Sequence, residues 1–175
     1  LIVAYEDDTD IYLDGDLSLV FANLAKAGDY VLIEGNEYRN GGSNRTLYVS
    51  ASKNVYAWQG IGGTTSEANQ GMFFVPPLSC QSQGEVNNIP FIDKIGTANF
   101  PGFVTIVTNQ TASVTFSDDA NTNRSLDDLS FDGGVSVTGP ELVSGVNYKA
   151  YIIEDIKGNV SIYSTEELYC SYYNQ

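Results

Sequence analysis

The sequence has no histidine among its 175 residues, and it holds one methionine, one tryptophan, two cysteines and only eight lysine and arginine residues. Without histidine, the Ser-His-Asp and Cys-His nucleophile systems cannot form. A hydrolase would have to rely on carboxylates alone, and 22 acidic residues bring pairs of carboxyl groups together by chance. We therefore expect a protein that is not an enzyme.

The scarcity of basic residues leaves a formal net charge of −14. Such a molecule repels phosphate backbones and anionic headgroups, which argues against nucleic acids as partners. No apolar run approaches the roughly eighteen residues of a membrane span, so membrane insertion is not expected either. The chain opens directly on a strand-like segment, residues 1–5, from which we expect a processed product or one domain of a longer protein.

Aromatic and turn-forming residues are abundant, with twelve tyrosines, eight phenylalanines and seventeen glycines. This balance favours pleated, half-buried surfaces and predicts an all-β fold. Residues 45–60 show the pattern most clearly, because small or apolar side chains alternate with polar or aromatic ones on either side of a polar turn at 52–54.

The second half of the chain repeats the layout of the first. The corresponding segments are 104–119 with 2–16, 142–151 with 24–33, and 158–173 with 45–60. The repeat predicts an antiparallel β-sandwich built from two copies of a three-part hairpin unit. The first copy spans 1–80 and ends in a Pro-Pro exit segment, a connector spans 81–103, and the second copy spans 104–175. The two lobes either join end to end or share one compact sandwich.

Cys80 and Cys170 are the two cysteines. Because the chain has no histidine, the two cysteines cannot complete a zinc site without several carboxylates. A single disulfide is therefore the better prediction, and two buried thiols are the alternative. The bridge would close a loop of about ninety residues and stabilise the fold by roughly 4 to 5 kcal/mol in the chain-entropy model. It would imply an oxidising compartment, extracellular or periplasmic.

Three segments of the first half, residues 4–13, 27–30 and 47–57, resemble the N-terminal module of IgGFc-binding-type proteins. In that family an A-x-E-D-x-T-x-V strand pair precedes a G-x-x-Y strand and an I-x-S-x-K-P-V-A-V hairpin. Asn54 stands here where the family usually has proline. Residues 59–63 and 67–80 are similar to versions found in large Bacteroidetes surface proteins, including gliding-motility adhesins of the SprB type.

The resemblance implies an extracellular or cell-surface location and a module without established catalytic residues. Immunoglobulin binding does not carry over, because no residue here matches a known binding motif for it. The expected function is a structural or adhesive β module of a secreted or cell-surface multidomain protein, within an adhesin filament or stalk. Its partners would be neighbouring modules of the same polypeptide or filament, and a glycan or surface ligand.

Acidic residues gather at strand ends and turns, where calcium would find oxygen ligands. The candidates are Asp7, Asp8, Asp118 and Asp119. None matches the spacing of an EF-hand loop, and solvated turn acids are the competing interpretation. Calcium is the one candidate cofactor.

Exposed aromatic residues on paired strands suggest a second function, a carbohydrate-binding module. The candidates for stacking against sugars are Tyr56, Trp58 and Tyr172. The same residues could instead form the cross-strand ladders that stabilise a sheet. A third alternative is a coat or fibre-forming subunit, which the acidic composition, rich in tyrosine and asparagine, would also suit.

Overall fold

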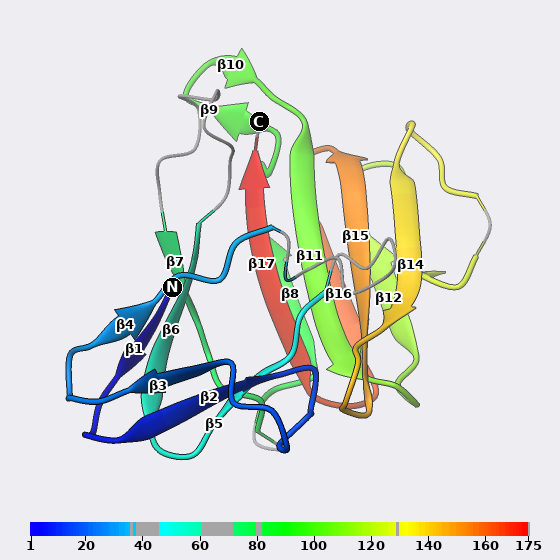
Figure 1. Ribbon diagram of the computed structural model, residues 1–175. Coiled ribbons are helices and arrows are strands. Elements are labelled where there is room, and N and C mark those ends of the chain that lie inside the picture. The colour runs from blue at the N-terminus through cyan, green and yellow to red at the C-terminus, as the bar shows by residue number, and fades with distance from the viewer. Residues whose placement is uncertain (36, 38–45, 61–71, 80–81, 129, 175) are drawn as a thin grey trace. The chain divides into compact units, whose positions relative to one another are not determined.

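The computed structural model describes residues 1–35, 37, 46–60, 72–79, 82–128 and 130–174. These residues form β-strands, turns and loops, and no α-helix occurs among them (Figure 1). In this part of the chain we accordingly find no helix of the length and apolarity that crossing a membrane requires. The chain divides into two units, residues 1–78 with 143–146, and residues 79–142 with 147–175. The all-β prediction is confirmed.

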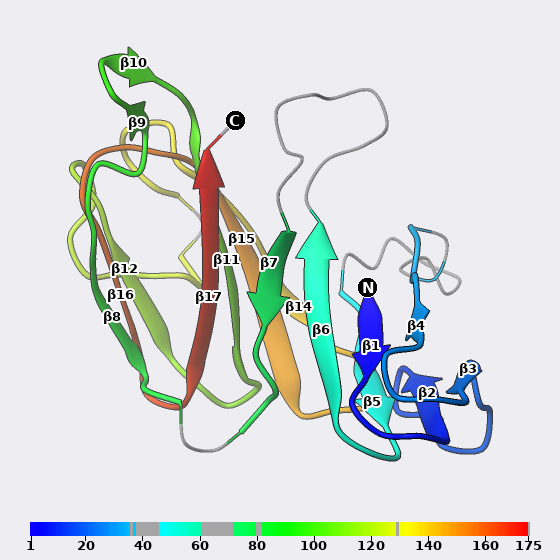
Figure 2. The same ribbon diagram turned by 90° about the vertical axis from the view of Figure 1, so that its left-hand side faces the viewer.

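Unit 1 contains two antiparallel sheets with the strand orders β4-β1-β6-β7 and β3-β2-β5. Figure 2 shows the strands of the first of these sheets side by side. The strands are β1 (Ile2–Ala4), β2 (Thr9–Leu13), β3 (Ala22–Leu24), β4 (Tyr30–Val31), β5 (Val49–Ala51), β6 (Val55–Gly60) and β7 (Met72–Val75).

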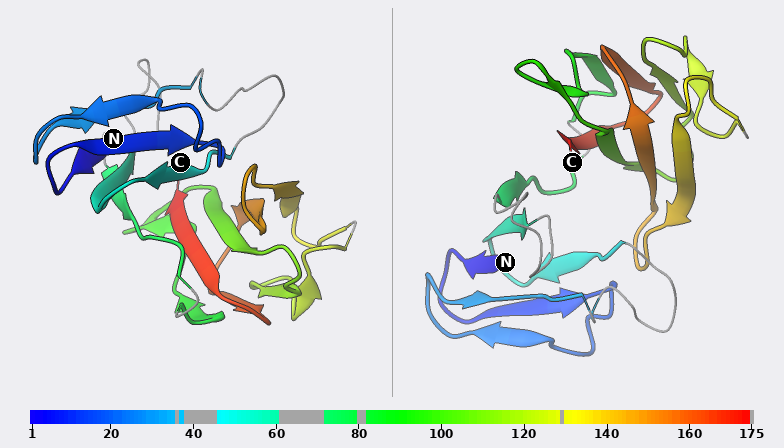
Figure 3. Two further views of the ribbon diagram at one scale, coloured as in Figure 1. Left: turned by 60° about the horizontal axis from the view of Figure 1, so that its bottom comes forward. Right: turned by 90° about the horizontal axis from the view of Figure 1, so that it is seen from above.

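The two sheets of unit 1 enclose one small core. Ile2 and Ala4 of β1 pack from one sheet, and Ile11 of β2 and Leu24 of β3 pack from the other. Figure 3 shows the sheet that contains β2 lying against the sheet that contains β1, in blue to cyan. Because successive side chains of a strand point to opposite faces, burial of Ile2 and Ala4 turns Val3 outward. The fold of unit 1 is therefore a small sandwich.

Unit 2 contains two four-stranded antiparallel sheets, β14-β15-β11-β17 and β13-β12-β16-β8, and the hairpin β10-β9. The strands are β8 (Glu85–Ile89), β9 (Lys94–Ile95), β10 (Ala98–Asn99), β11 (Gly102–Asn109), β12 (Val114–Ser117), β13 (Arg124–Ser125), β14 (Ser136–Leu142), β15 (Tyr148–Ile156), β16 (Val160–Ser164) and β17 (Leu168–Asn174).

The core of unit 2 is larger and lies between its two four-stranded sheets. β11 alternates strictly between buried and half-buried residues, with Val104 and Ile106 fully buried. Phe116 of β12 and Ile162 of β16 meet them from the other sheet. Residues 104–119 thus form two strands joined by a turn, β11 and β12, as the repeat predicts.

The strand–turn–strand segments of the sequence are not hairpins. β5 pairs with β2 and β6 pairs with β1, so the turn at 52–54 carries the chain from one sheet to the other. β1 and β2 likewise lie in different sheets. The alternation of apolar residues says which side chains face the core, and it is the same whether the next strand pairs alongside or crosses to the facing sheet.

The pairing patterns of the two units correspond. The order β4-β1-β6 in unit 1 has its counterpart in β15-β11-β17 of unit 2, and β3-β2-β5 has its counterpart in β13-β12-β16. Apart from β3 and β13, these strands lie within or overlap the segments that the sequence repeat matches to one another. The correspondence supports an internal duplication, which stays a prediction, as do the boundaries at residues 80, 81–103 and 104.

Candidate functional site: an aromatic face on unit 1

The outer face of the sheet β4-β1-β6-β7 bears a row of aromatic side chains. Tyr56 and Trp58 of β6, Phe74 of β7 and Tyr5, which directly follows β1, form this row, which we call the aromatic face. The register explains the grouping, because Tyr56 lies opposite Val3 and Trp58 lies opposite Phe74 on neighbouring strands. Residues directly opposite in an antiparallel pair share one face of the sheet.

Neighbouring rings of the aromatic face are in contact but are not coplanar. The ring centroids of Tyr5 and Tyr56 are 6.0 Å apart and the rings are inclined by 85°. For Tyr56 and Trp58 the centroid distance is 5.8 Å and the angle between the ring planes is 42°, and for Trp58 and Phe74 these values are 6.1 Å and 73°. Edge-to-face and tilted pairs of this kind stabilise a sheet by about 0.5–1.5 kcal/mol each beyond their buried area. The row thus presents both ring faces and ring edges outward.

The aromatic face is open to solvent. Tyr5 is 59% exposed, Phe74 is 51% exposed and Tyr56 is 45% exposed. The hydroxyl groups of Tyr5 and Tyr56 make no hydrogen bond to another residue in the described part of the chain. Exposed aromatic rings that touch one another form a contiguous apolar patch, and such patches on soluble proteins often mark binding surfaces.

Further uncharged side chains extend the same surface. Tyr30 lies opposite Val3 on the outer side of β4, and Met72 follows the row on β7, and both are strongly exposed. None of these strand positions carries a charge, although residues 1–78 hold ten acidic and four basic residues. Aromatic residues and methionine are enriched at protein interfaces, whereas aspartate, glutamate and lysine are depleted there.

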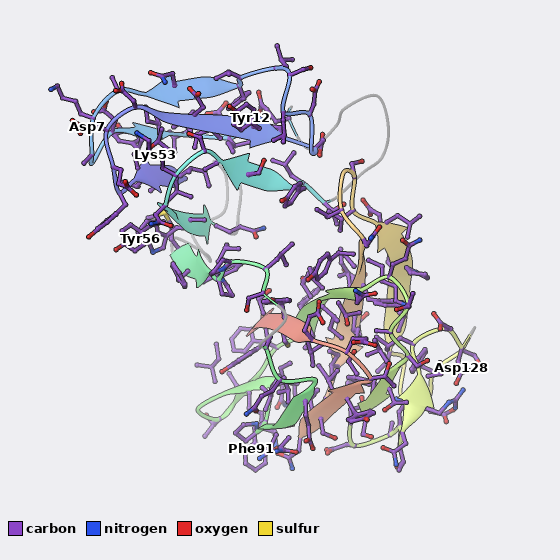
Figure 4. All side chains as sticks on the ribbon, turned by 90° about the horizontal axis from the view of Figure 1, so that it is seen from below. Asp7, Tyr12, Lys53, Tyr56, Phe91 and Asp128 are labelled. Atoms are coloured by element: carbon purple, nitrogen blue, oxygen red, sulfur yellow. The ribbon has the colours of Figure 1, made fainter. Side chains whose placement is uncertain are left out.

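An acidic turn lies directly beside the aromatic face. Glu6, Asp7 and Asp8 follow Tyr5 and are all exposed. The Tyr5 N–H donates to the Asn54 carbonyl, which holds this turn beside the start of β6. Lys53 donates from its ammonium group to the backbone carbonyl of Asp7. Figure 4 shows Tyr56, Lys53 and Asp7 toward the same end of unit 1.

Tyr169 of unit 2, which the sequence repeat matches to Tyr56, makes hydrogen bonds within the protein. The Tyr169 hydroxyl donates to the Ser79 carbonyl over 2.7 Å and accepts from the Ser79 N–H. Its ring lies 6.5 Å from that of Tyr148, whose hydroxyl donates to Glu167. Tyr169 and Tyr148 thus use their hydroxyl groups within the fold. The hydroxyl groups of Tyr5 and Tyr56 differ in having no such partner among the described residues.

A family model described as IgGFc binding protein matches residues 1–173 of the chain. The chain belongs to this family. Membership indicates an extracellular module with a binding or structural role. Searches of curated proteins and of solved structures gave no match.

Two of the three aromatic residues that the sequence suggested, Tyr56 and Trp58, lie together in the aromatic face. Tyr172 is 60% exposed but belongs to β17 of unit 2, so it is not part of the row. Sequence reasoning missed Tyr5 and Phe74. The alternation of 72–75 alone does not identify Phe74, because its place opposite Trp58 depends on the pairing of β6 with β7.

The four acidic calcium candidates are spread over several turns. The Asp7 carboxylate accepts from the Ala27 N–H, and the Asp118 carboxylate accepts from the N–H groups of Ala120 and Asn121. Asp119 accepts from the Asn159 N–H. Among the described residues no three acidic, histidine or cysteine side chains gather as a metal site would need. Calcium binding at Asp7, Asp8, Asp118 or Asp119 stays a prediction.

The disulfide prediction falls partly outside the described residues, because Cys80 is not among them. Cys170 packs against the core of unit 2, and burial raises the pKa of its thiol to about 11. The described part of the chain contains no disulfide. Residues on either side of Cys80 are nevertheless held near Cys170, since Ser79 bonds to Tyr169 and the Ser82 hydroxyl donates to the Leu168 carbonyl.

Proposed function

We propose that the chain is a non-catalytic adhesive module of a secreted or cell-surface multidomain protein, and that it binds a protein partner through the aromatic face. The observation that carries this proposal is the contiguous, solvent-exposed row of Tyr5, Tyr56, Trp58 and Phe74 on an uncharged sheet face. In a chain with a net charge of −14, an uncharged aromatic surface is the part best suited to close contact with another molecule.

The family description supports a protein as the partner, because it names binding to the Fc part of IgG. The chemistry of the face agrees with this choice. Tyrosine and tryptophan offer large contact areas with few rotatable bonds, which is why they dominate binding hot spots. The proposed setting within a filament or stalk, such as a gliding adhesin, rests on the resemblance of residues 59–63 and 67–80 to large surface proteins.

A carbohydrate ligand is the second candidate, and the same residues favour it less. An extended polysaccharide that stacks on several rings at once needs their planes to be roughly parallel. Here the three neighbouring pairs are inclined by 85°, 42° and 73°. A single sugar on one ring fits this geometry, whereas a flat chain of sugars across the whole row does not.

Adhesion under flow tests the proposal. Beads coated with the full chain are passed over immobilised IgG Fc, over a panel of basic and acidic extracellular proteins, and over neutral polysaccharides. The double variant Tyr56→Ala/Trp58→Ala is compared with Tyr163→Ala. Tyr163 is the matched control, because it is 53% exposed on β16 of unit 2 and lies outside the aromatic face.

The proposal expects retention of wild-type and Tyr163→Ala beads on at least one protein surface, with loss of retention for the double variant. Retention only on a polysaccharide would select the second candidate. Retention of the double-variant beads equal to that of the wild type would refute the role of the aromatic face. The absence of wild-type retention on every surface would refute it as well.

A further inference from the structure

Among the described residues, cations lie over aromatic rings of unit 2 but not over those of the aromatic face. In unit 2, Lys94 lies 5.3 Å from the Phe91 ring centroid and Lys149 lies 5.5 Å from that of Tyr151. The Arg124 guanidinium lies 5.6 Å from the Phe131 centroid. Each distance is within the range over which a cation is attracted to the electron-rich face of a ring. Three of the eight basic residues are thus used in this way.

In the described part of unit 1, no cation lies over a ring of the aromatic face. The lysines in this part are Lys26 and Lys53, and neither lies over a ring of the aromatic face. Lys53 instead donates to the carbonyl of Asp7. Exposed rings lie here beside the acidic side chains of Glu6, Asp7 and Asp8. Both the ring faces and the carboxylates attract positive charge.

We propose that the aromatic face binds an extended, arginine-bearing segment of a partner protein. This inference rests on the proposed function and names the chemistry of its partner. A guanidinium group stacks on aromatic rings and also pairs with carboxylates, whereas an ammonium group is more strongly hydrated and stacks less well. Arginine side chains over Tyr56 and Trp58 would complete the cation–ring contacts, and a neighbouring arginine would reach Glu6 or Asp8.

The shape of the surface suits an extended segment. The row runs across neighbouring strands from Tyr5 through β6 to Phe74 on β7. In an extended chain alternate side chains point to the same side, so every second residue of a bound segment can contact the row. The negative charge of the whole chain speeds encounter with a basic partner and repels acidic ones.

Fluorescence of the full chain offers a direct test, because Trp58 is the only tryptophan and lies within the aromatic face. The probe is a twelve-residue peptide that alternates arginine with valine. Peptides with lysine or glutamate in place of arginine are the comparisons. Each is titrated into the wild-type chain while the emission of Trp58 and the heat of binding are followed. IgG Fc and a neutral glucose hexasaccharide are titrated in parallel.

We expect the arginine peptide to change the Trp58 emission with the same midpoint as the heat signal, the lysine peptide to bind at least threefold more weakly, and the glutamate peptide not to bind. The double variant Tyr56→Leu/Phe74→Leu keeps apolar side chains but removes two rings, and should weaken arginine-peptide binding by at least fivefold. Tyr163→Leu should leave it unchanged. Equal binding of the arginine and glutamate peptides, or binding without a change at Trp58, would overturn the inference.

The parallel titrations separate this inference from the proposed function. Binding of Fc or of the hexasaccharide that changes the Trp58 emission, without binding of the arginine peptide, would overturn the inference and leave the aromatic face as a ligand surface. Absence of binding by every probe would overturn the inference, and the adhesion experiment then decides on the proposed function. Because the emission test uses the wild-type chain, it does not depend on the folding of any variant.

Discussion

Replacement of Tyr151 by phenylalanine tests the packing of unit 2 at its most buried tyrosine. Tyr151 is 1% exposed within the core, and its hydroxyl donates to the Asp127 carboxylate over 2.8 Å. Tyr151→Phe keeps the ring and removes the hydrogen bond. Loss of a hydrogen bond to a charged acceptor would normally cost about 1.5–3 kcal/mol, and Asp127 is exposed and regains water, so we expect a loss of about 1 kcal/mol at pH 7.

The stability that Tyr151 contributes to the fold falls as the pH rises. Burial, followed by the hydrogen bond and negative charge of Asp127, raises the pKa of Tyr151 above its ordinary value. A group whose pKa is raised on folding contributes stability that is fully present below its unfolded pKa, about 10 for tyrosine, and is lost as the pH rises above that value. At pH 11 the wild type should have lost at most about 1.4 kcal/mol from this group. Solvent screening at the exposed Asp127 reduces the expected loss to about 1 kcal/mol.

Urea unfolding of the wild type and of Tyr151→Phe at pH 7, 9, 10 and 11 measures both effects. The stability difference should be about 1 kcal/mol at pH 7 and should shrink toward zero by pH 11. Tyr163→Phe is the control, since Tyr163 is exposed, and its difference should stay near zero throughout. A difference for Tyr151→Phe that does not change between pH 7 and pH 11 would contradict the reasoning.

Two further predictions concern the backbone and the cysteines. Gly139→Ala should destabilise the chain by roughly 3 kcal/mol, because a φ of 128° is combined with a Cβ that would meet the Ala150 carbonyl and the Tyr151 backbone. Gly28→Ala, with a φ of 90° and open space, should cost only about 1 kcal/mol, and equal costs of the two variants in urea unfolding would argue against this backbone geometry. Cys80 and Cys170 should resist thiol labelling in the unfolded, unreduced protein and label fully after reduction, and labelling of both before reduction would show that no bridge forms.

The sequence was most informative about which side chains face the core. Val104 and Ile106 are buried as their alternation indicates, and the second strand at 114–117 also lies where the pattern predicts it. The pairing of strands was less accessible. Residues 45–60 were expected as a hairpin, but β5 and β6 lie in facing sheets. An arch and a hairpin bury the same alternate residues, so periodicity alone cannot separate them.

The candidate site could be anticipated only in part for a related reason. Tyr56 and Trp58 lie on one strand two positions apart, so the sequence alone places them on one face. Tyr5 and Phe74 join them through the pairing of β1 and β7 with β6, which depends on contacts between distant segments. Tyr172 is also an exposed tyrosine on a strand, but it is not part of the aromatic face because β17 belongs to unit 2. Long-range pairing is therefore what defines the aromatic face.

The emission of Trp58 during binding shows whether ligands bind at the aromatic face, because Trp58 lies within that face. The full chain is titrated with IgG Fc and with the arginine–valine peptide while calorimetry follows the same samples. We expect at least one of these probes to bind, and we expect the Trp58 emission to change with the same midpoint as the heat signal. Binding that leaves the Trp58 emission unchanged would contradict the claim that the aromatic face is the binding surface.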